Sequence, residues 1–297
     1  MSPEFSITST QRLKTGYDIP ILGFGTAGDV SDNYQMDPQE GENAVSKALA
    51  VGYRHIDSAR MYGSEKSCGA GIRRSKVPRE QIFVTSKVQS GAGYEDTNAA
   101  IDAGLKESGL EYFDLYLIHA PYGGSETRKG AWRAMVDAKG EGKVRSLGVS
   151  NFGLHHLREL EGYIAELEKE RGKGKGGEIS VGQWELHPWL MRKEIVAWCR
   201  EREVVVEAYC PLIRGQRFGE DSLKRVAERV NKTPAQVLLR WSIQKGFVPL
   251  PKSVTPARIE SNADLFDFVL DEADINELDT EEYAPCTWDP TMSSLAD

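Results

Sequence analysis

The chain alternates short apolar runs with longer amphipathic stretches along most of its length. The apolar runs are rich in β-branched and aromatic residues, which is typical of buried strands. Eight runs can be recognised, and they begin at Ile21, His55, Ile82, Phe113, Ser146, Ser180, Val204 and Phe247. The stretches between them have helical spacing, with clear examples that begin at Gly41, Thr97, Gly130, Leu157, Arg192 and Pro234.

Strict alternation of strand and helix predicts a parallel sheet that is covered by helices. Eight such units in a chain of 297 residues match an α/β fold of the closed (β/α)8 TIM-barrel type better than an open doubly wound sheet. We therefore predict a single barrel domain over residues 1–297. Residues 5–20 read as an N-terminal hairpin, with its turn at Lys14, Thr15 and Gly16, that closes the bottom of the barrel. The C-terminal tail from Thr280 is predicted to fold over the barrel top.

Composition narrows the class of partner. The chain is 40% hydrophobic and has a formal net charge of -8, which argues against nucleic acid or an anionic membrane as the main partner. Its four cysteines are scattered without a C-x-x-C pair, which favours a reduced intracellular chain and no metal site.

Neither a secretion signal nor a membrane span is readable from the sequence. The first ten residues have no basic stretch followed by an apolar one, and no run of about 18 apolar residues occurs. The expected location is the cytoplasm, and MSPEF is left out of the fold argument. The Gly- and Lys-rich residues 170–178 are predicted to be a surface loop between a helix and a strand.

Three successive strands end in ionisable residues, namely Asp57, Lys87 and His119. Chemistry in a barrel of this kind lies at the C-terminal ends of the strands, and the alternation of side chains directs Lys87 and His119 to the same mouth. Taken singly, each residue is more often a solvated cap or a core residue. Together they predict a buried ion pair of Asp57 with Lys87, with Tyr62 in the loop above.

A tyrosine beside that ion pair has a chemical use. An adjacent ammonium favours the phenolate, so we expect Lys87 to lower the pKa of Tyr62 and to make it a usable acid. His119 could hydrogen-bond the same substrate oxygen and orient it.

Several segments, in order, resemble the signature motifs of the aldo-keto reductases. They are GYRHIDSARMYGSE, TSKV, LIHAP, LGVSNF, QWELHP, AYCPL and PLPKSVTPARI, and the resemblance extends from about Gly23 to Asn262. It implies a catalytic tetrad of Asp57, Tyr62, Lys87 and His119. By the same resemblance the protein reduces an aldehyde or ketone to an alcohol by hydride transfer from a nicotinamide cofactor, with Tyr62 as proton donor.

GFGTAG at Gly23 has the spacing of a G-x-G-x-x-G motif, but no helical pattern opens directly after it as a dinucleotide-binding fold requires, since the next such pattern begins at Gly41. The family instead holds its cofactor extended across the barrel top. The resemblance assigns the nicotinamide carboxamide to Ser150, Asn151 and Gln183 and the stacking ring to Tyr209, and Thr26 and Leu212 join this set. Alternatively, Ser150 or Asn151 caps the helix that begins at Leu154, Gln183 is an ordinary strand-end residue, and Tyr209 is a core residue.

The segment after the eighth strand offers cations and hydroxyls around a helix start, at Lys252, Ser253, Thr255 and Arg258. Such a group suits the 2′-phosphate of NADPH better than the bare ribose of NADH. The family's usual Glu-Asn pair after the arginine is replaced by Ser261 and Asn262, so the adenine contact of the glutamate is missing.

Three positions that often carry tryptophan in the family hold other residues here, namely Ala27, Gln89 and Ala120. We therefore expect a wider cup and a bulkier or more polar carbonyl substrate than a small aldehyde. The remaining walls are expected from Tyr122, Phe218 and Trp288.

Two other functions remain open at this point. The chain could be an NADPH-binding, redox-sensing regulatory subunit with slow turnover, or a barrel hydrolase in which Asp57 pairs with Glu65 or Glu185. The expected partner is a small-molecule carbonyl substrate, and the expected state is a monomer or weak dimer, with no metal.

Overall fold

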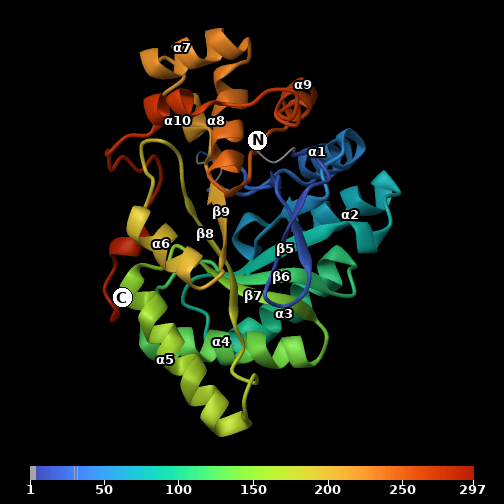
Figure 1. Cartoon of the computed structure of the whole chain (residues 1–297). Coiled ribbons are helices and arrows are strands. Elements are labelled where there is room, and N and C mark those ends of the chain that lie inside the picture. The colour runs from blue at the N-terminus through green and yellow to red at the C-terminus, as the bar shows by residue number, and fades with distance from the viewer. Residues whose placement is uncertain (1–4, 30, 32) are drawn as a thin grey trace.

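Eight parallel strands form the central sheet of the computed structural model, which describes residues 5–29, 31 and 33–297 (Figure 1). Each strand pairs with the next in the chain, so the order from β3 to β10 follows the sequence. The strands are β3 (Phe24–Gly25), β4 (His55–Asp57), β5 (Phe83–Val88), β6 (Phe113–Ile118), β7 (Val144–Ser150), β8 (Ile179–Glu185), β9 (Val205–Tyr209) and β10 (Val248–Pro249). Each contains part of one predicted apolar run.

The first and last strands meet and close the sheet into a barrel. The amide of Gly23 donates to the carbonyl of Pro249, and the amide of Gly25 donates to that of Pro251, both at 3.0 Å. The predicted TIM barrel is confirmed.

Ten α-helices accompany the strands in the described part of the chain and lie outside the sheet (Figure 1). They are α1 (Pro38–Val51), α2 (Glu65–Ser75), α3 (Tyr94–Ser108), α4 (Gly124–Gly140), α5 (Leu154–Arg171), α6 (Lys193–Glu201), α7 (Asp221–Val230), α8 (Pro234–Gln244), α9 (Pro256–Ser261) and α10 (Glu272–Leu278). All six helical patterns identified in the sequence are present. Residues 172–178 form the loop between α5 and β8, and the first two residues of the predicted loop 170–178 instead end α5.

Local sequence signals explain where the helices begin. Asp37 accepts hydrogen bonds from the amides of Gln39 and Glu40 at the start of α1, and Pro38 occupies the first turn. Thr233 and Gln236 form a reciprocal capping box at the start of α8. These caps satisfy amides that the helix itself leaves unpaired.

The barrel interior has its own apolar cluster, separate from the larger core between sheet and helices. Its members are Leu13, Ile19, Phe83, Leu115, Leu117, Val181, Val205, Val248 and Leu250. Because alternate residues of a strand share a face, Phe83 inside the barrel places Thr85 and Lys87 inside as well. The inward alternation predicted for β5 and β6 is therefore confirmed.

The N-terminal hairpin closes the bottom of the barrel, as predicted. It consists of β1 (Thr10–Arg12) and β2 (Asp18–Pro20), which pair antiparallel. Gly16 takes a φ of +86° in the turn, a conformation that favours glycine. Leu13 and Ile19 enter the interior cluster, and the hydroxyls of Thr15 and Ser146 lie 2.7 Å apart.

The tail also folds back onto the barrel. The amide of Gly124 donates to the carbonyl of Asp297 at 2.7 Å, and Arg128 donates to the carbonyl of Leu295 at 2.8 Å. The last residues are thereby attached to the beginning of α4. Among the described helices, none combines the length and the apolar character that crossing a bilayer requires.

We predict that Leu13→Ala destabilises the barrel without altering its mouth. Leu13 is 2% exposed, and shortening a buried leucine typically costs about 2–5 kcal/mol because a cavity remains. Urea unfolding measures the change. Val269→Ala, at a position that is 49% exposed, is the control and should change stability little. Equal unfolding midpoints for the two variants would show that the hairpin does not act as a plug.

Candidate active site

A buried ion pair occupies the C-terminal end of the barrel interior. Lys87 Nζ donates to Asp57 Oδ2 at 2.6 Å and to the carbonyl of Ser58 at 3.0 Å. Lys87 is fully buried and Asp57 is 4% exposed, so neither charge is shared with bulk water. Removing one partner of such a pair typically costs about 3–5 kcal/mol, because the other charge is left buried and alone.

Tyr62 and His119 lie beside this pair. A short 3₁₀ turn, Arg60–Tyr62, follows β4 and ends at Gly63, which has a φ of +59°. The Tyr62 hydroxyl lies 3.2 Å from His119 Nε2, and the two rings meet edge to face. Lys87 Nζ lies 5.0 Å from the centre of the Tyr62 ring. The four residues of the predicted tetrad are thus brought together.

Burial determines the protonation of the two ring residues. Desolvation, with the nearby Lys87 charge, holds the pKa of His119 well below its ordinary value, so its imidazole is neutral at pH 7. Desolvation, with the Asp57 carboxylate, raises the pKa of Tyr62 well above 10. The expected lowering of the Tyr62 pKa by Lys87 is therefore wrong for this state of the protein. Its phenol remains protonated.

A hydrogen-bonded network extends from Asp57 across the barrel. Gln183 Nε2 donates to Asp57 Oδ1 at 2.9 Å and to Glu207 Oε2 at 2.7 Å. His55 Nε2 lies 3.4 Å from Glu207 Oε1 and 3.0 Å from the Thr85 hydroxyl. Sequence reasoning missed Glu207 and His55, although a glutamate two residues after Val205 in an apolar run was a readable signal of an inward polar side chain.

The residues expected to hold the nicotinamide carboxamide lie at the ends of β7 and β8. Asn151 has a φ of +63°, and its amide donates to the carbonyl of His119 and to the Ser150 hydroxyl, both at 3.0 Å. Tyr209, which is half-buried, donates to Asn151 Oδ1 at 2.9 Å. The cap of α5 is Gly153, so neither Ser150 nor Asn151 serves as the helix cap.

Thr26 and Leu212 are placed differently. The Thr26 hydroxyl is buried and donates to the carbonyl of Asp57 at 2.9 Å, which fixes the end of β3 against β4. Leu212 is half-buried and precedes a turn at Ile213–Gly215 beyond β9. The Thr26 hydroxyl is thus engaged by the backbone of Asp57.

The predicted anion-binding residues follow β10. Lys252 Nζ lies 3.4 Å from Asp29 Oδ1, and the hydroxyl of the buried Ser253 accepts from the amide of Thr255 at 3.1 Å. Arg258 is exposed on α9, and the buried Asn262 ends that helix. The helix α9 has only six residues.

The expected substrate walls are only partly assembled around the tetrad. The Trp288 ring, from the tail, lies 6.3 Å from the His119 ring and 5.8 Å from that of Tyr122. The other positions differ in exposure: Ala27 and Phe218 are half-buried, Gln89 is exposed and Ala120 is fully buried. Of the expected walls, Trp288 thus makes a ring contact with the tetrad, and Tyr122 packs against Trp288.

Comparison with known proteins shows the family. The model of the Aldo/keto reductase family matches residues 21–281. The chain belongs to this family. It is therefore an oxidoreductase of the aldo-keto reductase type.

Several family members are similar to the chain over nearly its full length. Glyoxal reductase from Bacillus subtilis is 40% identical over 277 residues, which cover 92% of this chain and 93% of the relative. Methylglyoxal reductase DkgA from Yersinia pestis is 37% identical and covers 89% of each chain. A crystal structure of an aldo/keto reductase from Brucella melitensis is 39% identical with a TM-score of 0.80, over 91% of this chain and 98% of that one.

A second cluster of buried polar residues attaches the tail of this reductase to the end of β8. Glu185 accepts from the amides of Cys286 and Thr287 at 2.6 and 3.1 Å, from the Thr287 hydroxyl, and from His187 Nε2 at 2.9 Å. These contacts lower the pKa of Glu185 to about 2 despite its burial. Three atoms that could bind a metal, one each from Glu185, His187 and Cys286, lie within 4.8 Å of one another. The sequence spacing of these residues did not reveal this proximity.

The hydrolase alternative has no support in this arrangement. Glu185 is committed to the tail, and Glu65 accepts from Arg60 at 2.8 Å and from Ser86 at 2.6 Å. The carboxyl group that shares a donor with Asp57 is Glu207. Neither Glu65 nor Glu185 forms the pair that a two-carboxylate mechanism requires.

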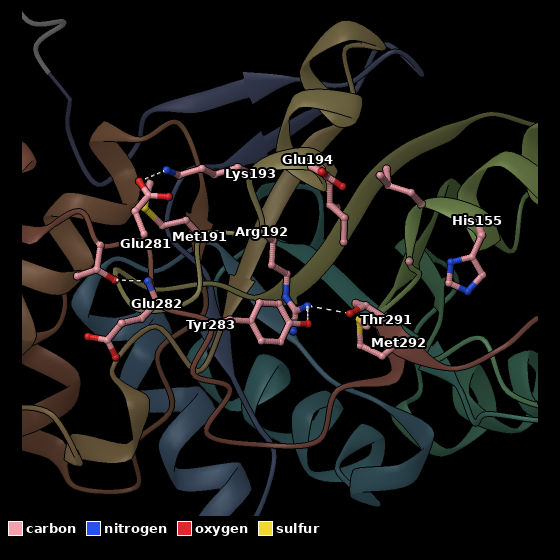
Figure 2. A pocket seen from close by; sticks show the side chains of 14 residues that line it. His155, Met191, Arg192, Lys193, Glu194, Glu281, Glu282, Tyr283, Thr291 and Met292 are labelled. Atoms are coloured by element: carbon pink, nitrogen blue, oxygen red, sulfur yellow. Dashed lines mark hydrogen bonds and ion pairs between the residues drawn. The ribbon is translucent and has the colours of Figure 1, made fainter.

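A cavity of about 450 Å³ lies away from the tetrad, between the starts of α5 and α6 and the tail (Figure 2). Arg192 extends into this region and donates to the hydroxyls of Thr291 at 2.9 Å and Tyr283 at 3.4 Å. It also pairs with Asp289 at 3.0 Å. These contacts reinforce the attachment of the tail that carries Trp288.

We predict that Glu185→Gln loosens the tail in a pH-dependent way. The folded pKa of about 2 lies below the ordinary 4.5, so the carboxylate's stabilisation of about 3 kcal/mol is present above pH 4.5 and is lost as pH falls toward 2. Urea unfolding of wild type and variant should differ by about that amount at pH 6 and by less than half of it at pH 3.

Glu282→Gln is the matched control for this prediction, because Glu282 pairs with Arg217 at the surface of the same tail. An exposed ion pair contributes about 0–1 kcal/mol. A stability difference for Glu185→Gln that is independent of pH would contradict the assignment of an ionised clamp.

Proposed function

We propose that this aldo-keto reductase uses NADPH to reduce an aldehyde or ketone to an alcohol, with Tyr62 as the proton donor. The observation that carries the proposal is the convergence of Tyr62 and His119, whose polar atoms lie 3.2 Å apart above the Lys87–Asp57 pair. Two neutral hydrogen-bonding groups thereby face one point at the barrel mouth. Membership of the family supplies the class of reaction.

A carbonyl oxygen within reach of both groups would accept hydrogen bonds from the Tyr62 hydroxyl and from His119 Nε2–H. A bound reduced nicotinamide supplies a hydride to the carbonyl carbon. The oxygen then gains negative charge and takes the Tyr62 proton. A protonated phenol and a neutral imidazole suit these roles, because both can donate at pH 7.

The ion pair acts on the deprotonated tyrosine. Once Tyr62 has given up its proton, the Lys87 ammonium near its ring stabilises the phenolate. Asp57 holds that ammonium in place and keeps the pair neutral before the transfer. Lys87 therefore stabilises Tyr62 after it has lost its proton, whereas burial keeps Tyr62 protonated before the transfer.

The residues near the mouth fit a nicotinamide carboxamide, with one restriction. Both hydrogens of Gln183 Nε2 are used within the barrel, so Gln183 can bind such a group only through its oxygen. Asn151 has both its amide hydrogens and its oxygen engaged by protein groups. We propose that Gln183 Oε1 and the Ser150 hydroxyl contact the carboxamide, while the half-buried ring of Tyr209 stacks on the nicotinamide.

The preference for NADPH over NADH rests on Lys252 and Arg258. Lys252 pairs with the exposed Asp29, which a phosphate dianion can replace as its partner. Arg258 is exposed on α9 and can join it, with Thr255 at the start of that helix and Asn262 at its end. Two cations near one phosphate would favour the phosphorylated cofactor.

The proposed substrate is a polar carbonyl compound. The relatives named glyoxal reductase and methylglyoxal reductase are 40% and 37% identical to the chain. The exposed amide of Gln89 and the small Ala27 also leave a polar, open side to the mouth. Tyr122, Phe218 and Trp288 would form the aromatic side, and a panel of aldehydes and ketones of graded size is the direct test.

The protein is proposed to act in the cytoplasm. The four cysteines are free thiols, which agrees with a reducing compartment such as the cytoplasm. We propose one reductase domain that acts as a monomer or weak dimer.

We predict that Tyr62→Phe abolishes most reduction but leaves cofactor binding intact. Loss of a general acid lowers kcat by about 10²–10⁴-fold, since the proton donor is removed while the ring remains. NADPH oxidation with methylglyoxal measures turnover, and fluorescence titration measures NADPH affinity. Tyr94→Phe is the control because that hydroxyl bonds Asp137 on the outer helices. Equal turnover of Tyr62→Phe and wild type would remove Tyr62 as the acid.

We predict that Lys252→Ala and Arg258→Ala each weaken NADPH binding more than NADH binding. A charge-assisted hydrogen bond contributes about 1.5–3 kcal/mol, so the NADPH dissociation constant should rise by about 10–100-fold. Titration with both cofactors measures the ratio. Lys224→Ala, on the surface of α7, should leave it unchanged. Equal weakening for both cofactors would place the 2′-phosphate elsewhere.

A further inference from the structure

Glu207 is a fully buried carboxyl group within hydrogen-bonding reach of the tetrad's supports, and the mechanism above does not use it. It comes from the middle of β9 and points into the barrel below Tyr209. Its Oε2 atom accepts from Gln183 Nε2 at 2.7 Å. The second hydrogen of the same nitrogen goes to Asp57 Oδ1 at 2.9 Å. Two carboxyl groups therefore share one amide.

That shared amide fixes the geometry of Asp57 from behind. Asp57 presents Oδ2 to Lys87 at 2.6 Å and Oδ1 to Gln183, so its orientation is set from both sides. If Glu207 lost its acceptor, one buried N–H of Gln183 would have no partner, and an unpaired buried donor is costly. The amide would turn to satisfy it, and Asp57 would lose its second donor.

We propose that Glu207 is a positioning residue of the reductase: through Gln183 it holds Asp57 against Lys87, beneath Tyr62. This inference rests on the proposed function, because it concerns the residues assigned there to proton transfer. It assigns Glu207 no contact with substrate or cofactor.

The charge of Glu207 follows from the groups that face it. They are His55 and Asp57 from β4, Lys87 from β5 and Gln183 from β8. Burial and the Asp57 charge raise the pKa of Glu207 to about 8, and burial with Lys87 lowers that of His55 to about 3. At neutral pH both are uncharged, so the single Lys87 cation is balanced by Asp57 alone.

This state has a consequence for activity at alkaline pH. As pH rises through about 8, Glu207 loses its proton and a second negative charge enters the site. A further negative charge nearby disfavours the Tyr62 phenolate and weakens Tyr62 as an acid. Reduction by the wild type should therefore decline above that pH.

The test compares Glu207→Leu, which removes the acceptor, with Glu207→Gln, which retains an uncharged oxygen for Gln183. With NADPH and methylglyoxal at pH 7, we expect Glu207→Leu to lower kcat by about 10–100-fold, as expected when reacting groups are misplaced. Glu207→Gln should stay within about threefold of wild type and should keep its activity above pH 8, where wild type declines. Ser146→Ala, which removes a buried hydroxyl that bonds Thr15 at the bottom of the barrel, is the matched control and should leave kcat unchanged.

The outcomes separate the two proposals. If wild type oxidises NADPH with methylglyoxal but Glu207→Leu matches its kcat and both 207 variants share its alkaline decline, the positioning role is overturned. If Glu207→Leu fails to fold by circular dichroism, Glu207→Ala, which also removes the acceptor, decides: a kcat equal to that of wild type overturns the role, and a loss of about 10–100-fold supports it. A wild type that reduces no carbonyl in the panel overturns the proposed function, and the role of Glu207 with it.

Discussion

The charge of Lys87, buried inside a barrel, is the constraint on which the rest of the site depends. An ammonium without water needs a carboxylate partner. Asp57, on the neighbouring strand, provides it, with Oδ2 at 2.6 Å from Lys87 Nζ. Burial, together with this charge, lowers the pKa of the nearby imidazoles of His55 and His119 and keeps both neutral. The polar layer of the barrel is thus arranged around one positive charge, with the apolar cluster and the N-terminal hairpin sealing it from below.

Burial and the Asp57 charge both raise the pKa of Tyr62 in this state of the protein. Considering the lysine alone gave the wrong sign, because a linear sequence reveals neighbours by type but not by depth. A phenol that stays protonated is a reservoir for one proton. Its usefulness depends on how strongly the developing alkoxide demands that proton, which is a property of the substrate and not only of the site.

The barrel and the tetrad could be predicted because both depend on period-two alternation and strand order. Lys87 lies near the end of β5 and His119 directly follows β6, and the parallel register that pairs Lys87 with Leu117 puts both at the same end of the barrel. The network at Glu207 was missed, because Gln183 and Glu207 are unremarkable singly and meet only when β8 and β9 are paired in register. The approach of Cys286 to Glu185 could not be predicted, since it depends on the path of an irregular tail with no periodicity.

The closure of the barrel between β3 and β10 affects where the barrel wall opens transiently. β3 and β10 contain two residues each, and β3 meets the end of the sheet at Gly23 and Gly25, whereas β6 and β7 are paired over five residues. Fewer hydrogen bonds make a junction easier to open, so transient opening should concentrate at the junction between β3 and β10. Lys252 lies just past one side of it and Thr26 just past the other. A ligand that contacted both residues would hold this junction closed. Its binding would reduce the mobility of the barrel wall, and the ligand would lose some of its own freedom of motion.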